Sequence, residues 1–389
     1  MISFNDTEIA FKSKSDKDLK RAYWLFKIVG IPASAKFGKV ATSIAFKLHL
    51  PIQGAIKSTI FKQFCGGESI ADCAEAIQHL DQYKIGTILD YSVEGKTSAE
   101  DFEKTTLEII ATIEKAKGNK AIPFAVFKVT GITRFGLLEK ANNINSNLSD
   151  SEKKEFQELV ERVDRICKKA YDNNVPLFID AEDSWIQDTI DRLTESMMVK
   201  YNKETCIIYN TMQMYRHDRL AYIHNCINTA KIGGYHYGIK LVRGAYMEKE
   251  RERAIEKGYP SPIQADKAAT DKDYDAAVAY ILDHLDVASL CAGTHNEDSS
   301  ATLAKMMEDR NLDKTDKRIY FAQLLGMSDH ISYTLSNLNY NVAKYVPYGP
   351  IKEVMPYLLR RADENTSVSG QTGRELTLIT KEINRRKGK

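Results

Sequence analysis

The pattern of hydrophobic and polar positions changes near residue 80. Before that point, lysine-spaced apolar stretches without strand alternation predict helices: AYWLFKIVG, KVATSIAFKLHL and AIKSTIFKQF. From Ile85 onward, short apolar or β-branched runs alternate with long charged segments, which is typical of buried parallel strands joined by crossover helices. We therefore expect an N-terminal helical arm at residues 1–80, followed by a β/α part at residues 81–389.

The β/α part contains eight apolar runs, each followed by a segment that can supply a helix. The runs are Ile85–Asp90, Phe124–Thr130, Leu177–Asp180, Cys206–Tyr209, Ile239–Arg243, Val287–Cys291, Ile319–Leu325 and Val342–Val346. Eight such units in series fit a closed (β/α)8 barrel better than an open doubly wound sheet. No G-x-G-x-x-G segment follows any run, which argues against a Rossmann domain. The predicted fold class is α/β, a TIM-like barrel with an N-terminal helical arm.

Local signals predict several helix boundaries. Ser149 and Glu152 have capping-box spacing before an amphipathic stretch, and Thr97 and Glu100 have the same spacing after the first run. The connection from Met247 to about Asp286 is too long for a minimal crossover. Its charged beginning is expected to cover the mouth of the barrel.

Composition narrows the class of protein. Of the 389 residues, 43% are hydrophobic and 28% are charged, as in globular proteins, and a net charge of +2 gives no reason to expect nucleic acid. No apolar run approaches the ~18 residues of a spanning helix, and the polar N-terminus lacks a targeting pattern. We therefore expect a cytoplasmic protein. The six cysteines form no C-x-x-C pair, so neither a metal site nor a disulfide framework is predicted.

The stretch from Tyr345 to Asn365 predicts a strand, a tight turn and a helix with two adjacent arginines. Two guanidiniums beside a carboxylate suit a bidentate grip on the carboxylate of a small substrate. The same spacing also fits a solvated helix face with i,i+4 charge pairs, so spacing alone leaves both interpretations open. The side chains that share one helix face are Tyr357, Arg360, Arg361 and Glu364. Pro356 argues against one uninterrupted helix from Pro350, because proline is disruptive beyond the first turn.

Polar residues recur at the ends of the predicted strands, where barrel enzymes carry their chemistry. Lys128 lies inside an apolar run, so it must point into the barrel or pair with a carboxylate. Glycine at 244 allows a ligand to approach the backbone closely. The other residues at these ends are Asp180, Glu182, Gln213, Lys240, Arg243, Ala245, Thr294, His295 and Asn296. Their recurrence at one rim predicts a functional site.

Seven motifs then occur in order between about Lys128 and Asn365: FKVTG, IDAE, KLVRGAY, THN, QLLGM, YVPYGP and PYLLRRADEN. In these motifs the chain resembles the proline dehydrogenase family, which uses FAD to oxidise L-proline to Δ1-pyrroline-5-carboxylate. The segments KLVRGAYMEKER and YVPYGP resemble those of the monofunctional, eukaryotic-type branch of this family.

The resemblance implies roles at the matched positions. Arg360, Arg361 and Lys128 would bind the proline carboxylate, with Asp180 and Glu364 as ionic partners. The residues that would wall the substrate ring are Tyr246, Leu324, Tyr345 and Tyr357. The resemblance implies that the cofactor contacts Asp180, Gln213, Lys240, Arg243, Gly244, Ala245, Thr294, His295 and Asn296. Lys240 occupies the position of an arginine that contacts the flavin N5 region in bacterial members, and a lysine cannot reproduce a planar bidentate contact.

The resemblance further implies a membrane quinone as electron acceptor and pyrroline-5-carboxylate dehydrogenase as the downstream enzyme. Two interpretations of the apolar and basic N-terminal arm stay open: its apolar face packs on the barrel, which is the favoured one because the lysines form no single strip, or the arm makes a peripheral contact with the inner membrane.

Three alternatives stay open: a hydroxyproline dehydrogenase, a Schiff-base aldolase that uses Lys128 or Lys240, and a non-catalytic barrel that binds an amino acid. Tyr345 argues against the first, because the resemblance implies a smaller residue there in hydroxyproline-preferring relatives.

Overall fold

The structure is a computed structural model of the 389-residue chain. It describes residues 2–29, 54, 57–93, 95, 97–367 and 371–388, with side chains for all of these except 29, 361–367, 371 and 372. The lysine-spaced stretch at 39–50 therefore lies outside the described residues.

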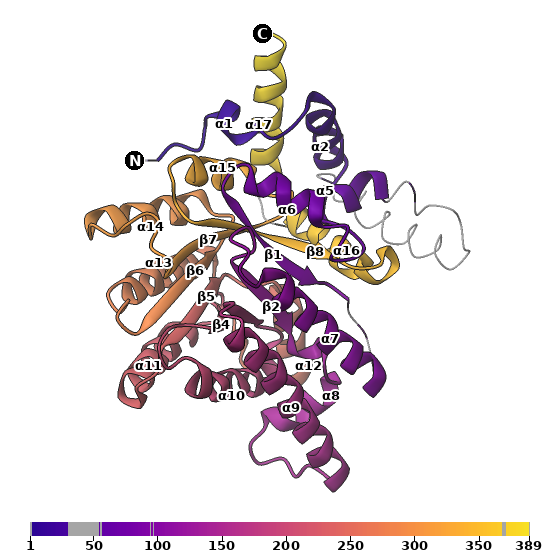
Figure 1. Cartoon of the computed structure of the whole chain (residues 1–389), viewed down its shortest axis with the longest axis vertical. Helices are drawn as coiled ribbons and strands as arrows, with labels where there is room; N and C mark the ends of the chain where they lie inside the picture. Colours follow the sequence, from indigo (N-terminus) through magenta and orange to yellow (C-terminus); the bar gives the residue numbers. More distant parts are fainter. Residues whose placement is uncertain are drawn as a thin grey trace. The chain divides into compact units, whose positions relative to one another are not determined.

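Eight strands form a closed barrel in sequence order (Figure 1). Every strand pair with a determined register is parallel, which confirms the predicted fold class. The strands are β1 Ile85–Tyr91, β2 Phe124–Lys128, β3 Leu177–Asp180, β4 Ile208–Gln213, β5 Tyr237–Val242, β6 Ala288–Gly293, β7 Ile319–Leu324 and β8 Val342–Tyr348.

Predicted boundaries of β2, β4, β5, β6 and β8 differ from the structure by two residues or more, and contacts explain the largest difference. The fourth strand is not Cys206–Tyr209 but runs on to Gln213, because its polar residues are satisfied by neighbouring elements. Asn210 donates to Asp191 at 2.9 Å, and the Thr211 hydroxyl donates to the Ile179 carbonyl at 2.9 Å. The second strand ends at Lys128, where a turn of 3₁₀ helix follows.

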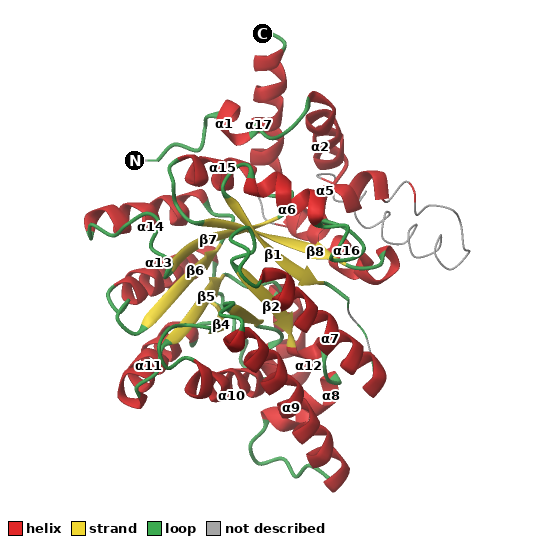
Figure 2. Cartoon of the chain, in the orientation of Figure 1, coloured by secondary structure: helices red, strands yellow, loops and turns green. Residues whose placement is uncertain are grey.

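Helices follow the strands and lie outside the sheet (Figure 2). Their bounds are α7 Ala99–Ala116, α8 Phe135–Asn142, α9 Asp150–Asp172, α10 Ser184–Tyr201, α11 Arg219–Gly233, α12 Met247–Lys257, α13 Lys267–Leu282, α14 Glu297–Asp309, α15 Asp329–Asn337 and α16 Ile351–Ser367. The predicted capping box of Ser149 and Glu152 begins α9. The box predicted at Thr97 is wrong, because Ser98 caps α7 by accepting from the backbone N–H of Asp101 at 3.1 Å.

Shorter helices precede the barrel, as the lysine-spaced pattern predicts for the described part of the arm. They are α1 Thr7–Ala10, α2 Asp16–Val29, a π-helical turn at Lys57–Phe61, α5 Lys62–Phe64 and α6 Ala74–Asp81. A C-terminal helix, α17 Gln371–Arg386, packs against α1 and α2. No described helix has both the length and the apolar character to span a bilayer.

The chain divides into two compact units, which are described separately here. One is Gly95–Ala322, and the other combines Ile2–Glu94 with Gln323–Lys389. The second unit has its own apolar core, in which Phe64, Val354 and Leu358 are almost fully buried.

Helix α16 in the second unit continues through Pro356, so the expected interruption there is wrong. Proline cannot donate the backbone hydrogen bond that its position would supply. The burial of Val354 and Leu358 on either side offsets this loss, since packing of an apolar face provides most of a helix's stability in a protein.

Candidate functional site

In the first unit, an aromatic floor lies beneath the polar strand ends. It consists of Phe124, Phe178, Tyr209 and Tyr320, from four different strands. The rings of Phe124 and Phe178 stack with their centroids 4.4 Å apart. Because side chains alternate along a strand, Lys128 lies on the same face of β2 as Phe124, and Asp180 on the same face of β3 as Phe178. The period of two therefore carries these polar groups to the inner face above the rings.

Asp180 is the central carboxylate of this unit. It accepts a hydrogen bond from Lys240 and forms an ion pair with Lys128 at 3.2 Å. Burial favours the neutral acid, but the two ammoniums, Lys240 foremost, outweigh it and hold the pKa of Asp180 below its ordinary value. The Lys240 Nζ also lies 5.4 Å from the centre of the Phe178 ring. The result is a cluster in which two ammoniums approach one buried carboxylate beside an aromatic ring.

Glu182, two residues beyond β3, has the opposite character. Its carboxylate accepts from the backbone N–H of Thr130 at 3.0 Å and from the Thr130 hydroxyl. Burial raises the pKa of Glu182 to about 7, although these hydrogen bonds counteract part of the effect. The carboxylates of Asp180 and Glu182 are two residues apart, yet burial and neighbouring charges shift their pKa values in opposite directions.

Gln213 ends β4 and is 3% exposed. Its Oε1 has no hydrogen-bond partner among the described residues. A buried amide oxygen without a donor is costly, and a ligand N–H would satisfy it. The ring system of a flavin carries such an N–H, so this buried oxygen fits the cofactor that the resemblance implies.

Gly244 follows β5 with φ +128°, a conformation that side chains rarely permit. A Cβ atom there would lie 2.5 Å from the ring of Tyr215. The Gly244 backbone thus packs directly against the Tyr215 ring, which leaves no room for a side chain, and Ala245 beside it is exposed. Tyr246, half-buried, then leads into α12.

Arg243 is held by three hydrogen-bond partners. Its guanidinium donates to Asp271 at 2.8 Å, Thr294 at 2.6 Å and Ser299 at 2.9 Å. It also lies 4.4 Å from the centre of the Tyr274 ring. Arginine's planar fork suits this arrangement, because it presents several donors in fixed directions.

The Thr294–Asn296 segment after β6 is organised by its own hydrogen bonds. The Thr294 hydroxyl accepts from the Asn296 backbone N–H at 3.1 Å, and the Asn296 side chain caps α14 by accepting from the Ser299 N–H at 3.1 Å. His295 between them is half-buried. The N-terminus of α14 and the Arg243 guanidinium, which is ion-paired with Asp271, thus lie close together. Backbone N–H groups at a helix N-terminus are groups that bind phosphates.

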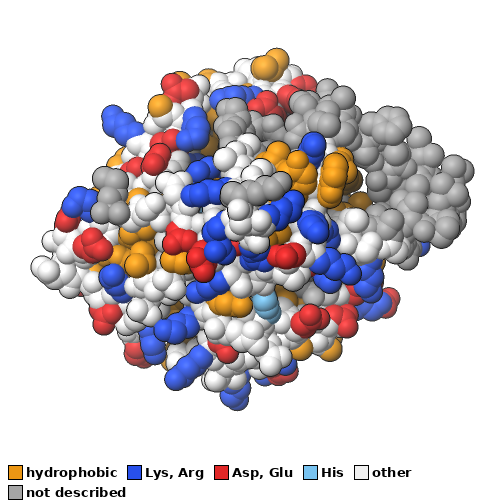
Figure 3. All heavy atoms as spheres, turned by 90° about the horizontal axis from the view of Figure 1, so that it is seen from above, with side chains coloured by type: hydrophobic (Ala, Val, Ile, Leu, Met, Phe, Trp, Pro, Cys, Tyr) orange, Lys and Arg blue, Asp and Glu red, His pale blue; other side chains and the backbone are white. Residues whose placement is uncertain are grey.

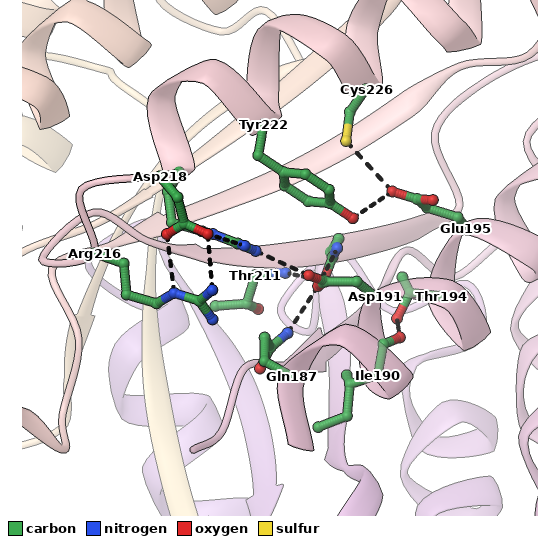
Figure 4. A network of polar contacts seen from close by, with 12 residues as sticks. Gln187, Ile190, Asp191, Thr194, Glu195, Thr211, Arg216, Asp218, Tyr222 and Cys226 are labelled. Carbon is green, nitrogen blue, oxygen red and sulfur yellow. Dashed lines mark hydrogen bonds and ion pairs between the residues drawn. The ribbon is translucent and has the colours of Figure 1, made fainter. Parts of the chain in front are cut away.

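A buried polar network lies next to the ends of β3 and β4 (Figure 4). Asp191 on α10 accepts from Arg219 at 2.9 Å and from Gln187 at 2.8 Å, and Gln187 accepts in turn from the backbone N–H of Glu182 at 2.8 Å. Asp218 joins Arg216 to Arg219. The network connects the loop after β3 with the loop after β4. Nothing in the sequence indicates it, because its members show no common spacing.

The second unit contains three of the residues that are expected to wall the substrate ring: Leu324, Tyr345 and Tyr357. Tyr345 on β8 and Tyr357 on α16 are 7% and 5% exposed, and Tyr357 is part of the apolar core against which Leu324 packs. Arg360 on α16 is half-buried. The helix includes Arg361 and Glu364, but their side chains lie outside the described residues.

Among the described residues, no group of three or more His, Cys, Asp or Glu side chains could hold a metal ion. All six cysteines are buried.

Comparisons with known proteins agree with this architecture. The family model described as "Proline dehydrogenase" matches residues 73–374. A protein named proline dehydrogenase 1, mitochondrial, from Dictyostelium discoideum is 33% identical over 98% of this chain and 74% of its own length. A hydroxyproline dehydrogenase from Xenopus laevis is 29% identical over 99% of this chain and 90% of its own length.

Among solved structures, proline utilization A from Bdellovibrio bacteriovorus has a TM-score of 0.73 at 18% identity. The match covers 95% of this chain and 40% of that chain, and it supports the fold. Together, the family match over most of the chain and the one-third identity with a relative that is covered over 74% of its length show that this chain belongs to the proline dehydrogenase family.

Proposed function

We propose that the protein is an FAD-dependent proline dehydrogenase that oxidises L-proline to Δ1-pyrroline-5-carboxylate, the first step of proline catabolism. The observation that carries this proposal is the Lys128–Asp180–Lys240 cluster over the aromatic floor. Such a cluster places two lysines and a carboxylate at the strand ends of a barrel, and the chain belongs to the proline dehydrogenase family.

FAD, when bound, supplies the two-electron acceptor that no side chain can provide. The residues that would hold it are Asp180, Gln213, Lys240, Arg243, Gly244, Ala245, Thr294, His295 and Asn296. Two observations support this set: the unpartnered Oε1 of Gln213, and the Arg243 guanidinium beside the N-terminus of α14.

For the substrate, we assign carboxylate binding to Arg360, Arg361 and Lys128, with Glu364 and Asp180 as their ionic partners. Tyr246, Leu324, Tyr345 and Tyr357 are assigned to the walls around the ring. A secondary amine must lose its proton before the neighbouring carbon can release a hydride. The task of these side chains is then to orient the ring and exclude water, and the burial of Tyr345 and Tyr357 is compatible with it.

We further propose that a membrane quinone takes the electrons and that pyrroline-5-carboxylate dehydrogenase consumes the product. A quinone is confined to the bilayer, so we propose that the protein works in the cytoplasm in peripheral contact with the inner membrane. Helix α2 supports the contact, because Trp24 and Ile28 are 58% and 55% exposed and Lys27 lies over the Trp24 ring at 5.1 Å. Figure 3 shows hydrophobic side chains intermingled with Lys and Arg on one face. We keep the division into an arm at 1–80 and a catalytic barrel at 81–389 as part of this proposal.

Hydroxyproline is the second candidate substrate, since a relative named hydroxyproline dehydrogenase matches almost the whole chain. Proline is preferred here because Tyr345 keeps its full bulk in the proposed wall. A Schiff-base aldolase is disfavoured, because Lys128 and Lys240 are both ion-paired with Asp180, and a protonated amine cannot attack a carbonyl.

Anaerobic addition of L-proline to the purified, FAD-loaded protein tests the function. Bleaching of the flavin absorbance is expected. A flavin that stays oxidised with L-proline but bleaches with 4-hydroxyproline would favour the second candidate. Binding of proline without bleaching would indicate the non-catalytic barrel, and borohydride trapping of a carbonyl substrate on a lysine would indicate the aldolase.

A further inference from the structure

The turn between β7 and α15, residues 325–328, has an unusual backbone. Gly326 has φ +75° and Ser328 has φ +49°, both in the left-handed region, and Ser328 has a side chain. A Cβ atom at Gly326 would clash with the backbone oxygen of Gln63. At Ser328, this conformation costs free energy, and it persists only where the surrounding contacts hold it.

Two buried side chains hold the carbonyls of this turn. The ammonium of Lys344, 1% exposed, donates to the Leu324 carbonyl at 3.2 Å and to the Met327 carbonyl at 2.8 Å. Gln63, 5% exposed, donates to the Gly326 carbonyl at 2.9 Å. The charge of Lys344 is balanced by Asp329 at 2.8 Å. Every one of these groups belongs to the second unit.

A third side chain holds the end of the turn. Glu375, on the C-terminal helix α17 and 3% exposed, accepts a hydrogen bond from the backbone N–H of Ser328. Ser328 precedes the first residue of α15, so this carboxylate satisfies an N–H at the start of a helix. Gln63 and Glu375 both lie outside residues 73–374, the part of the chain that matches the family model.

The turn borders the proposed substrate wall on two sides. It directly follows Leu324, and the Leu325 N–H donates to the carbonyl of Tyr345 at 2.8 Å. Leu324 itself packs against the core that contains Met327 and Tyr357. A shift of the turn would therefore move three of the four proposed wall residues.

We propose that Glu375 and Gln63 are positioning residues for substrate: by fixing the 325–328 turn, they set the places of Leu324 and Tyr345 and so the affinity for proline. This inference rests on the proposed function, because Leu324 and Tyr345 matter only if they contact the substrate. It gives the arm and the C-terminal helix a part in substrate binding.

Helix α17 supplies a matched control. Glu382, on the same helix and fully buried, pairs with Arg385 and Arg386 at 2.8 Å and is not among the side chains that hold the turn. Glu382 holds Arg386, which ties α17 to the N-terminal segment by donating to the carbonyls of Lys14 and Phe11, and only Glu375 touches the turn. Glu375→Gln keeps an oxygen that can accept from Ser328, whereas Glu375→Ala does not.

The experiment compares FAD-loaded wild type with Glu375→Ala, Glu375→Gln, Glu382→Ala and Gln63→Met. We expect Glu375→Ala to raise the KM for proline about tenfold, with kcat within about twofold. Glu375→Gln should restore most of the affinity, and Gln63→Met should raise KM several-fold without burying a new charge. Glu382→Ala should lower the melting temperature and leave KM unchanged. Binding of tetrahydrofuran-2-carboxylate, which has no ring amine to oxidise, should weaken in parallel with KM.

Amide hydrogen exchange of residues 324–328 tests the positioning without any substrate. Faster exchange there in Glu375→Ala and Gln63→Met, but not in Glu382→Ala, is expected. The inference is overturned if exchange and KM in the two turn variants match those of Glu382→Ala. If wild type is not reduced by proline, the proposed function fails by itself, and slow exchange in Glu375→Ala would then also reject the role of Glu375 in holding the turn.

Discussion

Lys240 on β5 donates a hydrogen bond to Asp180 on β3, across the intervening strand β4. The two residues are 60 positions apart in the chain. Lys128 approaches the second oxygen of the same carboxylate at 3.2 Å. One buried carboxylate therefore compensates two ammoniums, and its removal would leave both without their shared partner.

Asp180→Asn should destabilise the protein by about 3–5 kcal/mol and lower its flavin content, because breaking a buried ion pair leaves uncompensated charge. Thermal unfolding and the ratio of flavin to protein absorbance measure the two effects. Asp309→Asn is the control, since its pair with Lys305 is exposed to solvent and should contribute little to stability. Equal effects of the two substitutions would contradict a special role for Asp180.

Arg360→Met and Arg361→Met should each raise the KM for proline strongly, because each removes a charge-assisted contact that is typically worth about 2–5 kcal/mol when buried. Steady-state kinetics with proline and an artificial acceptor measure the change. A wild-type KM in either variant would assign that arginine to the solvated helix face.

Tyr345→Ser should shift preference toward 4-hydroxyproline, because it removes bulk beside the substrate ring. Shape selection of this kind is usually worth about 1–3 kcal/mol, so the ratio of kcat/KM values should change without a complete switch. The measurement is that ratio for the two substrates. An unchanged ratio would remove Tyr345 from the wall.

Glu182→Gln should reduce the loss of stability between pH 5 and pH 8. Burial raises the folded-state pKa of Glu182 from 4.5 to about 7, so between these values the folded protein binds more protons than the unfolded chain. Stability from this group is therefore present below pH 4.5 and declines until pH 7, by roughly 3 kcal/mol.

Melting temperatures of wild type and Glu182→Gln at pH 5 and pH 8 test this sign. The Thr130 hydroxyl can turn to accept from the new amide, so the substitution should fold. Identical pH dependence in both proteins would exclude Glu182 as the titrating group.

The double substitution Trp24→Gln with Ile28→Gln should weaken binding to anionic lipid vesicles, because it removes the two exposed apolar side chains of α2. Co-sedimentation at low and high salt, with and without proline, is the measurement. Ile232→Gln is the control, as Ile232 is an 89% exposed residue on α11. If wild type shows no salt-sensitive binding to the vesicles, the arm has only a structural role. The lysines at 36, 39 and 47, which entered this prediction, lie outside the described residues.

Much of the fold could be predicted because its signals are local. Most buried strands coincide with a short apolar run, and the capping box of Ser149 and Glu152 marks the start of α9. The predictions were wrong where contacts between residues far apart in the sequence decide the secondary structure. The polar Asn210 continues β4 because Asp191 on α10 satisfies it, and Pro356 stays helical because its neighbours are buried.

The sequence by itself determined the number of β/α units, the family and the kinds of side chain at the strand ends, because order along the chain and a period of two carry that information. Only the tertiary structure decided which of those side chains meet. Asp180 and Glu182 are two residues apart, yet Lys240 and Lys128 lower the pKa of the first while burial raises that of the second. Likewise, nothing near Glu375 in the sequence indicates that it accepts from Ser328, since that contact exists only once α17 has packed.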